Sequence, residues 1–127
     1  MKRISILATL FIVWTLCVSL AVSAHHSINA EFDSSKQVTL NGIVTNVDWM
    51  NPHTYVFVDV KNTPTAGTTR TWACELASPN ELARRGVTRD SLKVGMVVRV
   101  VGVRAKDGSF KVHTEKIMTD TSVLSPR

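Results

Sequence analysis

Apolar and polar residues alternate along much of the chain beyond residue 37, which is the pattern of β-strands that bury one face. The alternation predicts five strands, at about residues 38–49, 54–61, 70–76, 96–105 and 110–118. In the first strand the parity of the apolar positions changes at Asn41-Gly42, which predicts a β-bulge that bends the strand there. Turn residues separate later strands, namely Pro64 with Gly67 and then Asp107-Gly108.

A short helix is predicted between the third and fourth strands. Ser78-Pro79-Asn80-Glu81 has the order of a capping box, with serine before the first turn and glutamate three residues later. Arg84 and Arg85 suit the negative end of a helix dipole, and Gly86 can end the helix. Five strands, a bent first strand and a helix in this place favour a mainly β, OB-like barrel. A small open β-sandwich is the alternative, because periodicity identifies strands better than closure.

The predicted OB-like β domain covers residues 37–119. Residues 25–36 are polar and lack periodicity, so we expect them to form an N-terminal arm. Residues 120–127 are expected to form a polar C-terminal tail.

The first 24 residues have a different composition from the rest. Lys2 and Arg3 precede a nearly uncharged apolar stretch from Ile4 to about Val22, and Val22-Ser23-Ala24 resembles a signal peptidase site. We therefore expect residues 1–24 to be a cleaved signal peptide and the protein to be periplasmic or secreted. A retained transmembrane anchor is the alternative, since about 20 apolar residues can span a bilayer. Polar residues within the stretch favour removal, which leaves no membrane span.

Removal of this segment changes the size and charge of the protein. Without the first 24 of its 127 residues the chain has 103, which is enough for one domain and too few for a multi-domain enzyme. The net charge falls from +5 to +3 because Lys2 and Arg3 are lost. That small excess does not predict a nucleic-acid-binding protein. Cys74 is then the single cysteine, so no internal disulfide can form, and its place in an alternating stretch predicts a buried thiol.

Several short motifs are distributed along the chain after residue 24. They are His25-His26-Ser27, Trp49-Met50-Asn51-Pro52-His53, Trp72 with Glu75, Ser78-Pro79-Asn80, Arg84-Arg85-Gly86, Leu92 with Gly95, and Gly102 before Asp107-Gly108. Together they resemble a family of small exported bacterial proteins of unknown function, with a post-signal His-His-Ser and an internal Asn-Pro-His. Val87 stands at what looks like a tryptophan position, and Met96 where an acidic residue is more typical. The resemblance implies export and a single domain, and it carries no activity.

The histidines are the candidate metal ligands. Cleavage after Ala24 would make His25 the N-terminal residue, whose amine and imidazole can chelate one metal, and a second imidazole would complete a nitrogen set that suits Cu(II). This arrangement resembles the histidine-brace sites of some exported copper proteins. The candidate ligands are His25, His26, His53 and His113, with His25 and His53 the best pair. The alternatives are solvation of His26 on the arm, a turn hydrogen bond for His53, and an exposed strand face for His113.

A second candidate site lies where the first two strands are joined. OB-like domains commonly bind ligands with this connection and the neighbouring sheet face. The candidate ligand-binding residues are Trp49, Asn51, His53, Tyr55, Arg84 and Arg85. Core packing is the alternative for Trp49, and stabilisation of the helix end is the alternative for the arginines.

We find none of the protease, redox or phosphate-loop motifs in the sequence, and therefore predict no catalytic residue. An oxidative copper enzyme stays open if a brace leaves a free coordination position. The interpretation favoured by the sequence is an exported, non-enzymatic binding module for a small molecule, a glycan or an envelope protein, and export argues against nucleic acid. The alternative is a copper-binding protein that uses its mature N-terminus.

Overall fold

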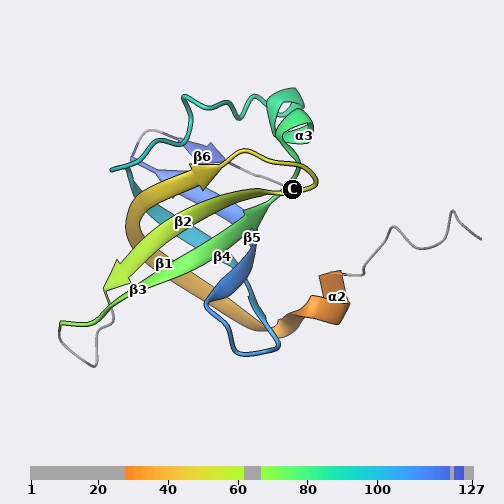
Figure 1. The fold of residues 1–127 in the computed structure, drawn as a ribbon, viewed down its shortest axis with the longest axis vertical. Helices are drawn as coiled ribbons and strands as arrows, with labels where there is room; N and C mark the ends of the chain where they lie inside the picture. The colour runs from red at the N-terminus through yellow and green to blue at the C-terminus, as the bar shows by residue number, and fades with distance from the viewer. Residues whose placement is uncertain (1–27, 62–66, 121, 125–127) are drawn as a thin grey trace, which may run out of the picture.

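The computed structural model describes residues 28–61, 67–120 and 122–124. Within these residues, six strands and two short helices follow one another (Figure 1). They are α2 (Ile28–Glu31), β1 (Phe32–Asp48), β2 (Thr54–Lys61), β3 (Thr69–Leu76), α3 (Pro79–Arg84), β4 (Val97–Ala105), β5 (Lys111–Thr119) and β6 (Val123–Leu124). Within these described residues, no helix has the length and apolar character needed to cross a bilayer.

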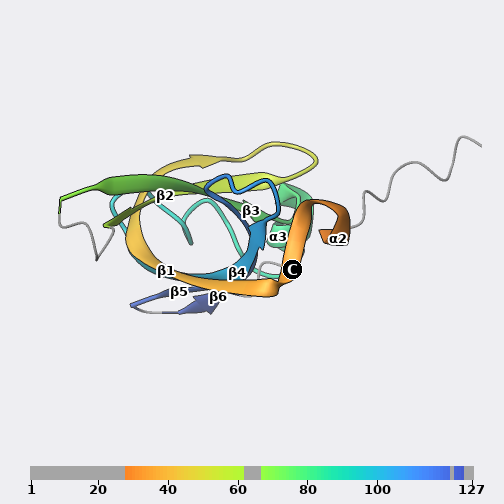
Figure 2. The same ribbon diagram turned by 90° about the horizontal axis from the view of Figure 1, so that it is seen from below.

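The strands form one sheet that curls into a ring. Antiparallel neighbours follow the order β3-β2-β1-β4-β5-β6, and a parallel pairing between β3 and β5 closes the ring. That pairing is short, since only Ala73 to Glu75 and Lys111 to His113 take part. Figure 2 shows the strands curving around a common interior. The predicted mainly β fold is confirmed, with the strand order and ring-like closure expected of an OB-like barrel.

The predicted helix is confirmed as α3. The hydroxyl of Ser78 accepts a hydrogen bond from the backbone N–H of Glu81 at 3.4 Å, and Pro79 occupies the first turn. Gly86 follows the helix with a φ of 79°, a conformation that glycine adopts without strain.

The bulge predicted at Asn41-Gly42 is wrong in its position. The pairing of β1 with β4 is continuous from Gln37 to Ile43, and the register with β2 shifts between Val44 and Asn46. The position of the bulge was mispredicted because Gly42 occupies an inward position but has no apolar side chain to continue the alternation. A Cβ atom there would lie 2.3 Å from the carbonyl oxygen of Asp59, so only glycine fits where β1 bends closely over β2.

The predicted N-terminal arm and C-terminal tail both contribute to the fold. Residues 28–31 form α2, and residues 32–36 belong to β1 rather than to an arm. Phe32 is buried with Val103 and Ala105 in a small separate cluster, a single anchor that leaves no periodic signal in the sequence. Val123 and Leu124, which were assigned to the tail, form β6 and pair with β5.

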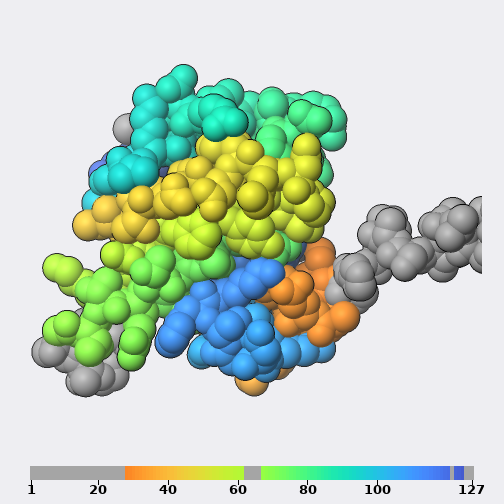
Figure 3. Space-filling view, in the orientation of Figure 1, coloured from red at the N-terminus to blue at the C-terminus, as the bar shows by residue number. Residues whose placement is uncertain are grey.

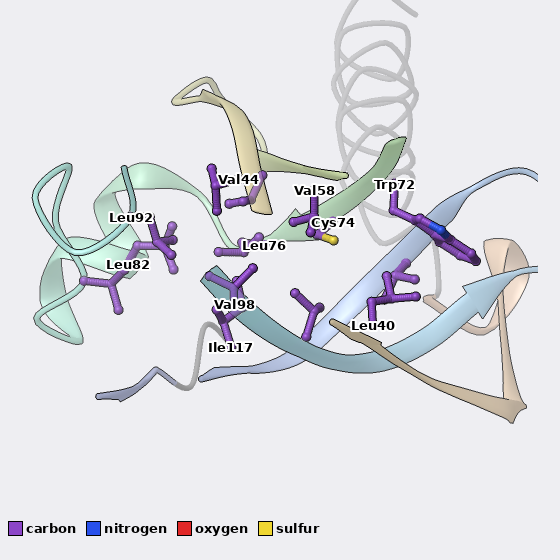
Figure 4. Close-up of a cluster of buried hydrophobic side chains, with 14 residues drawn as sticks. Leu40, Val44, Val58, Trp72, Cys74, Leu76, Leu82, Leu92, Val98 and Ile117 are labelled. Atoms are coloured by element: carbon purple, nitrogen blue, oxygen red, sulfur yellow. The ribbon is translucent and has the colours of Figure 1, made fainter. Parts of the chain in front are cut away.

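The main core fills the interior of the ring. Figure 4 shows Leu82 and Leu92 at one end of this core, and Leu40 and Trp72 at the other. Cys74 is a free thiol that is fully buried in the core, as predicted. Burial raises the pKa of the thiol to about 12, so the sulfur stays protonated and packs as a small apolar group.

Candidate functional site

A row of polar side chains crosses the outer face of the ring where β3 meets β5. Tyr55 of β2 pairs with Glu75 of β3, and Glu75 pairs with His113 of β5. Paired residues project from the same face of a sheet, and side chains alternate along each strand. This face is therefore the one opposite Cys74. We call the group formed by His53, Tyr55, Glu75, Lys111 and His113 the Glu75 cluster.

The two oxygens of Glu75 have different surroundings. The Tyr55 hydroxyl donates a hydrogen bond to Oε2 at 3.0 Å, and the Lys111 ammonium lies 2.9 Å from the same oxygen. Oε1 instead faces two imidazoles, with His53 Nε2 at 3.8 Å and His113 Nδ1 at 3.9 Å. These two distances exceed hydrogen-bond length. Oε1 is thus flanked by two nitrogen atoms and hydrogen-bonded to neither.

The cluster holds Glu75 in its ionised form. Burial by itself raises the pKa of Glu75, but the neighbouring His113 imidazole, the Lys111 ammonium and the Tyr55 hydroxyl stabilise the carboxylate more strongly, so the pKa falls to about 2. The pKa of Lys111 is raised, because hydrogen bonds to Glu31 and Glu75 outweigh the opposing effect of burial. Burial and the adjacent Glu75 carboxylate raise the pKa of Tyr55. At neutral pH the cluster contains a carboxylate, an ammonium and a neutral phenol.

The N-terminal segment, residues 28–32, packs beside this cluster. Glu31 Oε1 lies 2.6 Å from Lys111 Nζ, and the Phe32 and His113 rings are 5.4 Å apart between centroids. The Lys106 ammonium also donates a hydrogen bond to the carbonyl of Asn29 at 2.5 Å. Figure 3 shows this orange segment in contact with the blue surface of the β4–β5 hairpin. The segment therefore covers part of the outer face of β5.

His113 does not lie on an exposed strand face, which corrects that alternative from the sequence. Its side chain is 13% exposed. Both ring nitrogens are buried without a hydrogen-bond partner. The cause is Phe32, which covers β5 on the side where alternation alone predicts solvent. An unpaired buried polar group costs about 1–3 kcal/mol, so a hydrogen-bond or metal partner for this imidazole would stabilise the folded protein.

The spacing within the cluster only partly resembles that of metal ligands. Two atoms bound to one ion at ~2 Å lie at most about 4 Å apart, and they reach that separation only on opposite sides of the ion. The His53–Glu75 and Glu75–His113 separations of 3.8 and 3.9 Å are close to this limit, so one ion could not bind both imidazoles and Oε1 in this arrangement. Within the part of the chain that the structure describes, no group of three His, Cys, Asp or Glu side chains could hold a metal ion. His25 and His26 lie outside the described residues. Of the four predicted metal ligands, His53 and His113 thus face the same carboxylate.

Among the described residues, two of the six predicted ligand-binding residues, His53 and Tyr55, approach Glu75. Trp49 is half-buried against the main core, and the Arg89 guanidinium lies 5.5 Å from its ring centroid. Asn51 is exposed in the connection between β1 and β2. Arg84 is the last residue of α3, and Arg85 forms an ion pair with Glu81 one turn earlier. The predicted set is therefore divided between the cluster, the loop and α3.

A separate groove of about 520 Å³ lies along the outer side of β1 and β2. Its walls are formed by Asn41, Gly42, Ile43, Thr45, Asp59, Lys61, Thr69 and Val97. None of the predicted metal or ligand-binding residues belongs to these walls.

Sequence reasoning missed the roles of Glu75, Lys111 and Glu31. A charged residue in an alternating strand, such as Glu75 between Cys74 and Leu76, ordinarily indicates a solvent-facing position and not a buried site. The available signal was the presence of acidic and basic residues at matching outward positions of different strands. It could be used only once the β3–β5 pairing was known.

A family model matches residues 13–114 of the 127-residue chain. The chain belongs to DUF6152. This is a family of unknown function, in agreement with the resemblance to a family without an assigned activity. All residues of the Glu75 cluster, together with Glu31, His25 and His26, lie within the part of this DUF6152 member that the family model matches. Neither a curated protein nor a solved structure matches the chain.

Proposed function

We propose that the protein is an exported binding module, not an enzyme, and that its ligand is a transition-metal cation, with copper as the best match. The observation that carries the proposal is the placement of His53 Nε2 and His113 Nδ1 at 3.8 and 3.9 Å from one oxygen of an ionised carboxylate. Imidazole nitrogens are favoured copper ligands. The unpaired nitrogens of His113 add to this support, because a metal would give one of them a partner.

The charges of the cluster favour a cation over an anion. Glu75 within the cluster and Glu31 beside it both pair with the Lys111 ammonium, and these three charges sum to one net negative charge. Opposite charges attract more strongly near a low-dielectric surface than in bulk water. A cation would therefore relieve the excess charge, whereas an anion would meet a buried carboxylate.

The remaining ligands would come from the mature N-terminus. His25 is three residues before Ile28, the first residue of α2, and three fully extended residues span at most about 11 Å. The segment that follows packs on β5 through Glu31 and Phe32. The amine and imidazole of His25 would thus bind copper within reach of the cluster, and His53 would supply the third nitrogen.

Competitive Cu(II) titration tests this proposal on three proteins: the form that begins at His25, the same form with one extra N-terminal residue, and His53→Ala. We expect the first to bind most tightly and each change to weaken binding by roughly tenfold or more. Removing a group that only hydrogen-bonds a metal ligand often weakens binding by that factor, and loss of a ligand itself should cost at least as much. Electron paramagnetic resonance should report a nitrogen-rich site. The affinity for Cu(II) should fall as the pH is lowered, because protons compete for the ligands. A peptide with the same first residues controls for copper bound without a fold. Equal affinity in all three proteins would overturn the proposal.

The proposal also includes removal of residues 1–24 during export. N-terminal sequencing and intact mass of the protein recovered from outside the cytoplasm should identify His25 as the first residue. A mature protein that starts elsewhere would remove the N-terminal amine from the copper site.

A second candidate function is recognition of a small molecule, a glycan or an envelope protein by the loop of residues 49–53. The observation that favours it is the exposure of Met50, Asn51, Pro52 and His53 beside the Trp49–Arg89 contact. A glycan array probed with copper-free protein tests this candidate. Binding that Trp49→Ala abolishes, with copper affinity unchanged, would place the recognised ligand on the loop.

A further inference from the structure

Two arginines and two aromatic rings meet at the end of the main core that lies away from Leu82 and α3, where Figure 4 shows Trp72. The Trp72 and Phe110 rings meet edge to face, with their centroids 5.2 Å apart. The guanidinium carbon of Arg104 lies 5.3 Å from the Trp72 centroid and 5.7 Å from the Phe110 centroid. The guanidinium carbon of Arg70 also lies 5.7 Å from the Phe110 centroid. We call these four residues the arginine–aromatic cluster.

We infer that the arginine–aromatic cluster is a docking site for an acidic segment of another protein. The carboxylates of that segment pair with the two guanidiniums, and its apolar side chains lie against the exposed ring of Phe110. The site shares no residue with the Glu75 cluster or with the walls of the groove along β1 and β2. The inference therefore does not depend on the copper proposal.

The charges of the arginine–aromatic cluster call for an anion. The ion pairs found among the described residues involve neither Arg70 nor Arg104. Both guanidinium carbons lie 5.7 Å from one ring centroid, so they can be no further apart than twice that distance. Two like charges at such a separation repel each other, and a carboxylate bound between them would turn this repulsion into attraction.

The guanidiniums also have hydrogen-bond donors to offer. Each carries five N–H groups in a planar fork that matches a carboxylate. Arg104 donates from Nη2 to the carbonyl of Gly108 at 2.7 Å and from Nε to the carbonyl of Ser109 at 3.4 Å, and its other N–H groups are not used in these two bonds. Arg70 is exposed beside Phe110. A bound carboxylate would therefore meet one guanidinium fixed by the β4–β5 hairpin and another that can close over it.

Phe110 supplies an apolar anchor that is already held in place. Its carbonyl accepts a hydrogen bond from the backbone N–H of Ala73 at 2.9 Å, and its ring rests on that of Trp72. The side chain is nevertheless 43% exposed, which is a large apolar surface to leave in water. Fixed aromatic rings beside arginines are typical of the residues that dominate protein–protein binding energy. A surface that needs no rearrangement also loses less affinity to ordering.

A protein segment matches the arginine–aromatic cluster better than a nucleic acid does. Single-stranded nucleic acid is bound by a groove of several cations that follows its phosphates. The β4–β5 hairpin instead carries the carboxylate of Asp107, which accepts a hydrogen bond from the Ser109 N–H at 2.9 Å and would repel a phosphate chain. A peptide that carries a few carboxylates among apolar side chains can avoid this charge.

The first test compares two peptide probes, acetyl-Glu-Phe-Glu-amide and acetyl-Gln-Phe-Gln-amide, with the purified, metal-free protein. Each is titrated while the amide NMR signals of the protein are followed. The acidic peptide should shift the signals of residues 70–73 and 104–111, and it should bind roughly tenfold more tightly than the uncharged peptide, because its hydrogen bonds are charge-assisted. Shifts confined to other residues, or equal affinity for the two peptides, would overturn the inference. Tighter binding of a short oligothymidylate to the same residues would overturn it in favour of nucleic acid.

The second test uses Arg70→Gln, because this exposed side chain can be changed without releasing the hairpin that Arg104 holds. Arg99→Gln is the matched control, since it removes the same charge from an exposed position five residues before Arg104. Arg70→Gln should weaken binding of the acidic peptide by roughly tenfold, and Arg99→Gln should leave it near the wild-type value. Arg70→Lys should recover part of the loss, because it restores the charge without the planar fork. An equal loss in Arg70→Gln and Arg99→Gln would reduce the effect to net charge. A lower urea midpoint of Arg70→Gln with unchanged peptide affinity would show that the arginine only closes the end of the ring.

Discussion

Glu75 connects more of the site than any other residue of the cluster. Its carboxylate meets side chains from the loop before β2, from β2 itself and from β5, and each contributes a donor or a cation. Because the carboxylate is buried, its charge is sustained by these neighbours rather than by water. The protonation of Glu75 should therefore be coupled to folding.

Acid is expected to destabilise the fold through Glu75. Its pKa is about 2 in the folded protein against an ordinary value of 4.5, so the unfolded chain binds a proton in this interval that the folded chain does not. The stabilisation is fully present above about pH 5 and is lost as the pH falls toward 2. We expect about 2 kcal/mol, less than the ~3 kcal/mol of the full shift, because solvent reaches His53 and Lys111. Urea unfolding at pH 7 and pH 3 measures it, and Glu75→Gln should reduce the difference. An equal difference in that variant would show that other groups cause the acid sensitivity.

Trp49→Ala is expected to destabilise the domain partially. The ring packs against the core and contacts Arg89, and it is only partly buried, unlike a full core tryptophan. We expect a loss of about 2 kcal/mol, below the 3–5 kcal/mol typical of a large core truncation. Thermal melts followed by far-UV circular dichroism measure this loss. Complete unfolding at room temperature would contradict a role for Trp49 in recognition.

At the level of elements, the sequence predicted best where local signals agree. β2, β3, β4, β5 and α3 begin and end within a residue or so of their predicted bounds, because alternation, turns and the cap at Ser78 all point the same way. β1 was harder, since Gly42 carries no side chain to mark its inward position. α2 and the start of β1 are held by Phe32 and by ion pairs to distant strands, which no local pattern records. For the same reason, the sequence indicated His53, Tyr55 and His113 as site residues but not Glu75 or Lys111.

The bend of β1 provides a test at this scale. Gly42→Ala should cost about 3 kcal/mol, because the new methyl group would overlap the Asp59 carbonyl in the neighbouring strand. Asn41→Ala, at the exposed adjacent position, should change stability by less than about 0.5 kcal/mol. Equilibrium urea unfolding compares the two variants. Similar stabilities would mean that β1 relaxes away from β2 without penalty.

For the whole molecule, the ring and the site share the same few residues. The three residue pairs that close the ring between β3 and β5 include Glu75, Lys111 and His113. A metal held by ligands on both sides of this seam would join two strands that otherwise meet over a short length. Ligand binding to the folded state alone also raises its stability by mass action.

Copper should therefore raise the melting temperature of the mature protein. Free Cu(II) at a hundred times its dissociation constant should add about 2.7 kcal/mol of stability. Differential scanning calorimetry with and without copper measures the effect. His53→Ala should show a smaller increase at the same copper concentration. An increase of the same size in that variant would indicate that copper binds elsewhere.

The adjacent positions of Cys74 and Glu75 have a consequence for redox chemistry. The two residues are neighbours in the chain, yet the thiol projects into the dry interior while the carboxylate projects outward beside the histidines. A thiolate is a strong copper ligand, and it is also the form of cysteine that oxidants attack. With its pKa raised to about 12, Cys74 stays protonated behind the sheet. If copper binds beside the histidines as proposed, the backbone of β3 would separate the ion from the Cys74 thiol, so that the sulfur could not become one of its ligands.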